Sequence, residues 1–213
     1  MKQINTRPSF SKAVLIIPMM ILFLIVNLAS GELNYHHPDN AGNDELKKDS
    51  VESVNAFMQV YKVLMSPRCM NCHPSGDIPL QGDDSHIHTM EPKRGTDGKG
   101  LYAMKCMNCH QSANVPGAHT PPGNPNWHMP PADMKMIFEG RTPRQLARQL
   151  VDPNQNGHKD TKALLEHAHD GLVLAAWDPG EGRSLPPMSH EDFAKAWNRW
   201  INLGAFAPPA DAK

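Results

Sequence analysis

All four cysteines of the 213-residue chain lie in two copies of one motif, Cys-Met-Asn-Cys-His, at residues 69–73 and 106–110. C-x-x-C-H is the attachment motif of c-type haem. Two thiols three residues apart can each form a thioether with a haem vinyl group, and the histidine that follows can donate an imidazole nitrogen to the iron. The motif therefore predicts two covalently bound c-type haems. The thioethers would form at Cys69, Cys72, Cys106 and Cys109, and the axial histidines would be His73 and His110.

Two other uses of paired cysteines are open. Four thiolates can bind zinc, but the two pairs of such a site are usually about 15–20 residues apart, whereas Cys69 and Cys106 are 37 residues apart. Zinc also needs no histidine after each pair. Two structural disulfides would suit an oxidising compartment, although neighbouring C-x-x-C thiols form strained bridges that are more often redox-active. Haem is the favoured interpretation because the full motif, histidine included, occurs twice.

The N-terminus has the features of an export segment. Residues 1–12 hold three basic residues and no acidic one, residues 13–29 are almost wholly apolar, and small residues follow at 29–31. This pattern predicts a cleaved signal peptide or an uncleaved N-terminal membrane anchor over residues 1–31. Both place the rest of the chain outside the cytoplasm. We therefore expect a periplasmic protein, either free or anchored to the inner membrane through residues 13–29.

Hydrophobic periodicity predicts helices, and no strands, in the exported part. We expect helices over about 50–65, 100–106, 142–151, 161–169 and 189–203. Thr142 with Gln145 three residues later indicates a capped start of the helix at 142–151. The last helix would start at Ser189, present Phe193, Trp197 and Trp200 on one face, and stop at Gly204. Long Pro- and Gly-rich loops are expected at 74–100 and 111–133. Residues 32–48 are polar and are predicted to be a linker, which leaves residues 49–207 as the di-haem domain. Loops of this length in a compact domain need something to anchor them.

The composition limits both the core and the class of partner. The chain has 20 prolines and only 6% aromatic residues, and its proline content is about twice the ~5% average. We therefore expect no large core built from side chains alone, and two porphyrins to fill the interior instead. A net charge of -1 argues against a nucleic-acid-binding protein, which usually carries a basic surplus on one face.

Several stretches resemble a known family. Residues 98–110 resemble the start of a class I cytochrome c domain, and the two attachment motifs make the whole chain similar to a small exported di-haem cytochrome c. More narrowly, residues 57–205 resemble di-haem proteins labelled isoquinoline 1-oxidoreductase subunits. The stretches that carry this likeness are RCMNCHPSGDIPLQGDD, RGTDGKG, PPGNPNWHMPP and WDPGEGR. The resemblance implies a partner enzyme, a periplasmic molybdenum hydroxylase.

The fold expected from these observations is mostly α, with cytochrome c-like helices and long haem-wrapping loops. A full cytochrome c domain places its distal ligand tens of residues after the proximal histidine. The gap between the two motifs is too short to hold such a domain. We therefore expect both haems to share one intertwined domain, with their irons close enough for electron transfer between them.

Each iron also needs a second axial position, which histidine or methionine commonly fills. For the first motif we expect His88, because residues 86–90 place two histidines and a methionine together and because the resembling proteins carry a histidine there; His86 is the alternative. The other interpretation is a solvated polar loop. For the second motif we expect Met136 or Met129, unless these methionines only pack on the porphyrin. Less favoured candidates are His128, His169 and Met188.

The predicted role is electron transfer between a periplasmic or membrane dehydrogenase and another cytochrome or terminal oxidase, with no catalytic residue on this chain. Whether the protein is also an enzyme stays open. The alternative is a di-haem peroxidase-like enzyme, which would need one open axial site. A haem-based sensor is a third possibility, although the chain leaves no room for a signalling domain. Carbon monoxide would separate these functions, because six-coordinate electron-transfer haems do not bind it.

Overall fold

The computed structural model describes residues 39–212, with side chains described from residue 44. The predicted signal peptide or anchor, residues 1–31, lies outside the described residues, as does the first part of the predicted linker. Within residues 39–212, no helix combines the length and the apolar character needed to cross a membrane. The longer helices are α1 (Asp39–Leu64), α3 (Pro143–Val151), α4 (Thr161–His167) and α6 (His190–Asn202). The prediction of a mostly α protein is confirmed for this part of the chain.

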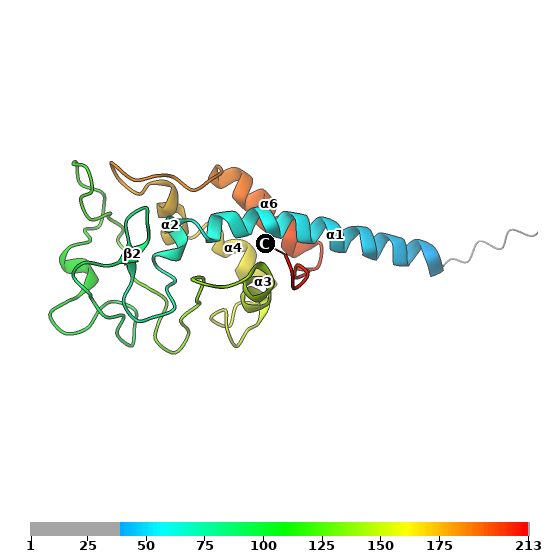
Figure 1. Ribbon diagram of the computed structural model, residues 1–213, viewed down its shortest axis with the longest axis horizontal. Coiled ribbons are helices and arrows are strands. Elements are labelled where there is room, and N and C mark those ends of the chain that lie inside the picture. Colours follow the sequence, from blue (N-terminus) through cyan, green and yellow to red (C-terminus); the bar gives the residue numbers. More distant parts are fainter. Residues whose placement is uncertain (1–38, 213) are drawn as a thin grey trace, which may run out of the picture. The chain divides into compact units, whose positions relative to one another are not determined.

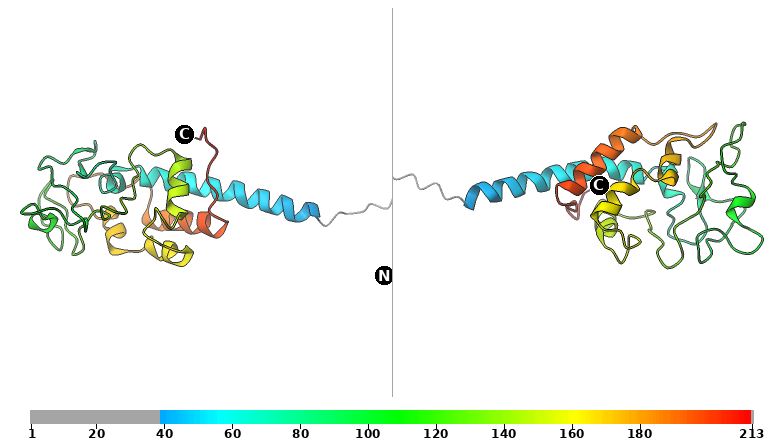
Figure 2. Two further views of the ribbon diagram at one scale, coloured as in Figure 1. Left: turned by 90° about the horizontal axis from the view of Figure 1, so that it is seen from below. Right: turned by 180° about the vertical axis from the view of Figure 1, so that it is seen from behind.

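Helix α1 begins at Asp39, eleven residues before the predicted start. Most of the segment predicted as a linker is therefore helical. The reason lies in residues 45–48, Glu-Leu-Lys-Lys, which are all good helix formers. The N-terminal half of α1 extends beyond the other helices (Figures 1 and 2). Pro67 begins the short helix α2 (Pro67–Met70), where proline suits the first helical position.

The C-terminal helices follow their predicted start signals. At α3, the Thr142 side chain accepts from the Gln145 backbone while the Gln145 side chain accepts from Thr142 N, which completes a capping box. Helix α6 begins after Ser189, whose side chain caps it. The chain leaves α6 near Gly204, at a positive φ of 99°, as expected for a helix stop. Two short elements were not predicted, α5 (Gly171–Leu174) and the 3-10 helix η2 (Ala175–Trp177).

The predicted helix over residues 100–106 is wrong. The backbone there has positive φ at both Gly100 (89°) and Tyr102 (49°), which a right-handed helix does not allow. A 3-10 turn, η1 (Cys106–Asn108), forms instead. The loop after the first motif also contains a small antiparallel ladder of β1 (Leu80–Gln81) and β2 (His86–Ile87), which the sequence did not indicate.

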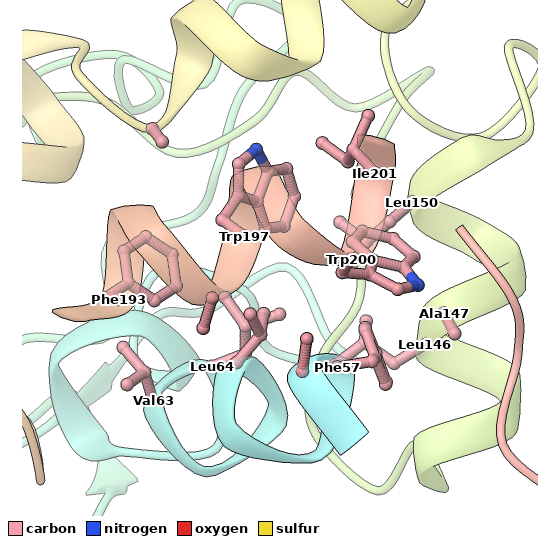
Figure 3. Close-up of a cluster of buried hydrophobic side chains, with 14 of the residues drawn as sticks. Phe57, Val63, Leu64, Leu146, Ala147, Leu150, Phe193, Trp197, Trp200 and Ile201 are labelled. Atoms are coloured by element: carbon pink, nitrogen blue, oxygen red, sulfur yellow. The ribbon is translucent and has the colours of Figure 1, made fainter. Parts of the chain in front are cut away.

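A side-chain core lies between α1, α3, α4 and α6. Figure 3 shows Phe57 of α1 against Trp200 of α6, with Leu146 of α3 beside them; all three are fully buried. The ring centroids of Phe57 and Trp200 are 4.7 Å apart. Burying each such side chain stabilises the fold by roughly 1.5–3 kcal/mol. The expectation of too little side-chain core is therefore wrong for the helical part.

The segment that carries the motif loops is built differently. It occupies the side of the described unit away from α3 and the C-terminal half of α6 (Figures 1 and 2). The structure describes all of residues 74–140, and few of them are buried. Apart from glycines, the buried residues of this segment are Pro74, Arg94, Asn124, Met129 and Phe138. Large apolar side chains of the same segment are instead exposed, among them Ile87, Met90, Tyr102, Met104, Met107 and Val115.

Candidate metal centres

The first motif is held by α2 and the turn that follows it. Cys69 lies in α2, Cys72 N–H donates to Cys69 O, and His73 N–H donates to Met70 O. The His73 Nδ1 atom lies 2.7 Å from the carbonyl oxygen of Met136. Since a carbonyl can only accept, Nδ1 carries the proton and the Nε2 lone pair is free to bind a metal.

An aromatic ring fixes the plane of the His73 imidazole. Phe138 stacks on it with ring centroids 3.9 Å apart and an interplanar angle of 8°. The segment that supplies the ring also binds the motif through its backbone, because Phe138 N–H donates to His73 O at 2.9 Å. The ring is therefore held by its edge and by one face before any metal is bound.

The second motif repeats this construction with different supporting residues. His110 Nδ1 lies 2.8 Å from the carbonyl oxygen of Pro122, so its Nε2 is also free to bind a metal. Trp127 stacks on the ring with centroids 4.1 Å apart and planes 9° from parallel. His110 N–H donates to Cys106 O, which closes the turn of the motif. Each motif thus presents a histidine that is oriented by a backbone carbonyl and by a stacked aromatic ring.

Burial sets the protonation state of these groups. It lowers the pKa of His73 to about 4, against the opposing effect of the Met136 carbonyl. It also lowers the pKa of His110. Both rings are therefore neutral near pH 7, which is the form that binds a metal. Burial raises the pKa of Cys69 to about 12 and that of Cys72 to about 11, so both are thiols rather than thiolates at that pH.

The four cysteines are free thiols. Within the part of the chain that the structure describes, no group of three or more His, Cys, Asp or Glu side chains is arranged to hold a metal ion directly. The described residues therefore form neither the disulfides nor the four-thiolate zinc site that paired cysteines also allow.

Two of the candidate distal ligands, His88 and Met136, lie elsewhere than the sequence placed them. His88, expected at the first motif, has its ring centroid 6.5 Å from that of His110, the histidine of the second motif. Met136, expected at the second motif, provides the carbonyl that binds His73. That carbonyl lies on the Nδ1 side of His73, away from the atom that would bind iron. The Met136 side chain packs partly buried against the helical core.

Met129 stays close to the second motif, as expected. Its side chain is buried, and its N–H donates to Gly98 O at 3.0 Å. The same Gly98 carbonyl lies 3.9 Å from Cys106 Sγ. The close contact between the backbones of residues 98 and 129 requires glycine at position 98. A Cβ on Gly98, where φ is 75°, would lie 1.9 Å from the Met129 oxygen.

The less favoured candidates lie in other surroundings. The exposed side chain of His86, in β2, contacts Asp84, with Nδ1 2.6 Å from Asp84 Oδ1. The Nδ1 atom of His128 lies 2.5 Å from the carbonyl oxygen of Asn126. The ring of His169 lies 5.3 Å from that of His190, and Met188 O accepts from Trp177 Nε1.

Sequence reasoning missed His167, at the end of α4. It lies close enough to His73 for its charge to lower the pKa of that ring. Its Nδ1 is 2.6 Å from Asp170 Oδ2, a carboxylate–histidine pair of the kind that orients metal-binding imidazoles. The spacing of three residues between His167 and Asp170, at the end of a predicted helix, is the signal that could have identified the pair.

The sequence also did not indicate a role for two arginines near the first motif. Arg94 is almost fully buried, and the side chain of Arg68 is only 7% exposed. Both charges lower the pKa of the Cys72 thiol, against the larger opposing effect of burial. Each keeps a buried Nε atom without a hydrogen-bond partner, although Arg94 Nε lies 3.5 Å from Asp77 Oδ1. Unpartnered donors on buried cations are costly, and the two carboxylates of a haem would satisfy them.

These features fit a covalently attached haem at each motif. The chain offers neutral, oriented histidines beside free thiols, buried guanidinium groups, and a loop segment with little core and exposed apolar side chains. A haem would bring an iron for the histidines, vinyl groups for the thiols, two carboxylates for the guanidinium groups and a large apolar surface for the exposed side chains. Comparison of the chain with protein-family models, with curated proteins and with solved structures gives no match.

Proposed function

We propose that this chain is an exported di-haem c-type cytochrome that transfers electrons between a periplasmic or membrane dehydrogenase and the respiratory chain. The observation that carries the proposal is the repeated arrangement of His73 and His110. In each, the Nδ1–H of the motif histidine donates a hydrogen bond to a backbone carbonyl, and the ring stacks on an aromatic ring. Both features prepare Nε2 for a metal.

The haem supplies one-electron redox chemistry when bound. The chain contributes attachment, orientation and exclusion of water. Each motif thiol would add across a vinyl group, with its sulfur going to one carbon and its hydrogen to the other, so attachment needs no oxidant. The two histidines would hold the irons. The loops over residues 74–140 would wrap the haems and cover their faces with apolar side chains that are otherwise exposed.

Electron exchange between the two centres needs them to be close. Cys106 of the second motif lies near enough to Cys72 of the first for its charge to raise the pKa of Cys72. The hairpin of β1 and β2 is tied to the first motif, since Leu80 N–H donates to Asn71 O. These links support the proposal of two haems in one intertwined domain rather than in two separate ones.

The partner is proposed on the resemblance and on charge. The resemblance of residues 57–205 to isoquinoline 1-oxidoreductase subunits implies a molybdenum hydroxylase as the electron donor. The first 31 residues hold three basic and no acidic residues, so the remainder is more acidic than the whole chain with its net charge of -1. Haem carboxylates add to this charge, and a basic patch on the partner would then steer association.

The function is tested on the haem-loaded protein by redox cycling and by carbon monoxide. We expect both haems to be reduced and reoxidised reversibly and the Soret band of the reduced protein to stay unchanged under carbon monoxide. A large Soret shift in the native protein, together with turnover of hydrogen peroxide, would instead support the peroxidase-like function and overturn electron transfer as the primary role.

A further inference from the structure

The rings of His88 and His110 lie near each other in an edge-to-face arrangement. Their centroids are 6.5 Å apart and their planes are inclined by 60°. His110 is the second motif's own histidine, and its Nδ1 edge is occupied by the Pro122 carbonyl. Its Nε2 edge is the edge left for a ligand.

The separation matches the geometry of two imidazoles on one ion. A metal–nitrogen bond to histidine is about 2 Å long, so two imidazoles on opposite sides of one ion have ring centroids roughly 6 Å apart. We propose that His88 is the second axial ligand of the haem attached at Cys106 and Cys109, opposite His110. This inference rests on the proposed function and deepens it by assigning bis-histidine ligation to the second centre.

The backbone around His88 holds the residue in place. His88 directly follows β2, and its N–H donates to Pro79 O at 3.0 Å. The same hairpin is bonded to Asn71 of the first motif through Leu80. Ligation by His88 would therefore tie a segment anchored on the first motif to the iron of the second.

One hydrogen bond has to open for this ligation. Met90 N–H donates to His88 Nδ1 at 3.2 Å, whereas binding iron through Nε2 requires Nδ1 to carry the proton. Met90 is 63% exposed, so its freed N–H can turn to water. Because water replaces the lost acceptor, opening this single bond costs little, and an iron–nitrogen bond forms in its place.

Met129 is the competing ligand, because it is buried and lies near Cys106 through Gly98. The test compares His88→Ala with Met129→Leu in the haem-loaded full chain, with His86→Ala as the matched control two residues away. The measurements are carbon monoxide bound per chain, the low-spin ferric electron paramagnetic resonance signal, and haem per chain. We expect His88→Ala alone to bind one carbon monoxide per chain and to lose half of the low-spin signal. Haem content should stay at two in all three variants.

A substitution that restores a ligand separates ligation from general damage. His88→Met should regain a six-coordinate haem, raise the reduction potential of one centre and add the weak long-wavelength band of methionine-ligated ferric haem. The centre is assigned in chains that keep only one haem, made by Cys69→Ala with Cys72→Ala or by Cys106→Ala with Cys109→Ala. His88→Ala should open the haem in the first chain and leave the second unchanged.

Three results would overturn the inference. They are unaltered spectra in His88→Ala, a new open site in Met129→Leu, or an effect of His88→Ala on a chain that retains only the first haem. A native chain that carries no haem would instead refute the proposed function, so the two failures are distinguishable.

Discussion

The imidazole of His110 and the indole of Trp127 lie face to face, with ring centroids 4.1 Å apart and planes 9° from parallel. His73 and Phe138 repeat the relationship at the first motif. An aromatic stack of this kind contributes about 0.5–1.5 kcal/mol beyond the burial of area. It also fixes the plane in which each imidazole would meet its iron.

We predict that Trp127→Leu changes the reduction potential of one haem and that Phe138→Leu changes that of the other, because each variant frees one imidazole to rotate. Potentiometric titration followed by absorbance measures both centres. Tyr102→Leu is the control, since Tyr102 is 90% exposed, and it should shift neither. An equal shift of both potentials in either variant would show that the stacks do not act on separate centres.

The helical core should respond independently of the motifs. Trp200 is fully buried, its indole packs on Phe57, and its carbonyl accepts from Ser53 Oγ at 2.9 Å. Trp200→Ala should lower the free energy of unfolding by about 3–5 kcal/mol, measured by chemical denaturation. Leu46→Ala, at a 63% exposed position of α1, should change it little. A loss at Trp200 no larger than that at Leu46 would contradict the assigned core.

The capping box of α3 gives a smaller, local effect. Thr142→Ala removes the acceptor for the Gln145 N–H, and we expect a loss of about 1 kcal/mol in the free energy of unfolding. Thr161→Ala is a matched control, because the cap of α4 is Asp160 and not Thr161. Equal losses in the two variants would show that the threonine methyl group, and not the cap, is responsible.

Glu139 makes stability depend on pH. Its Oε2 accepts from both Ser75 N–H and Ser75 Oγ at 2.7 Å, and these bonds hold the pKa of the carboxyl below its usual value. The unfolded chain therefore takes up this proton at a higher pH than the folded chain. The stabilisation is present above the unfolded pKa of about 4.3 and is lost as pH falls through the folded pKa.

Denaturation measured from about pH 6 to about pH 3 tests this dependence. Glu139→Gln should lower stability at the upper end by about 1 kcal/mol and should flatten part of the fall at the lower end. Ser75→Ala removes one of the two donors and should give a smaller effect of the same sign. An unchanged pH profile in Glu139→Gln would show that this carboxylate does not carry the dependence.

Local signals in the sequence were sufficient where the structure depends on local chemistry. The Thr142–Gln145 box, the Ser189 cap and the apolar face of Phe193, Trp197 and Trp200 each predicted an observed helix. The helix predicted at 100–106 failed because residues 100 and 102 adopt positive φ. The hydrogen bonds around these residues are local, with Gly100 N–H donating to Arg94 O and Cys106 N–H donating to Lys99 O, and hydrophobic periodicity does not reveal such a loop.

The candidate sites divide in the same way. Cys69, Cys72, His73 and their counterparts in the second motif could be predicted because the motif is contiguous. Their supports could not, since Met136 O and Pro122 O reach the histidines through the folding of loops. The expected pairing of His88 with the first motif also depended on closeness in sequence, whereas the loop brings His88 to His110.

The central claim is tested most directly by the intact mass of the exported protein, made with a c-type haem maturation system, together with haem content from the pyridine haemochrome. We predict two covalent haems per chain, one in Cys69→Ala with Cys72→Ala, and one in Cys106→Ala with Cys109→Ala. A native chain whose mass includes no haem would contradict the account.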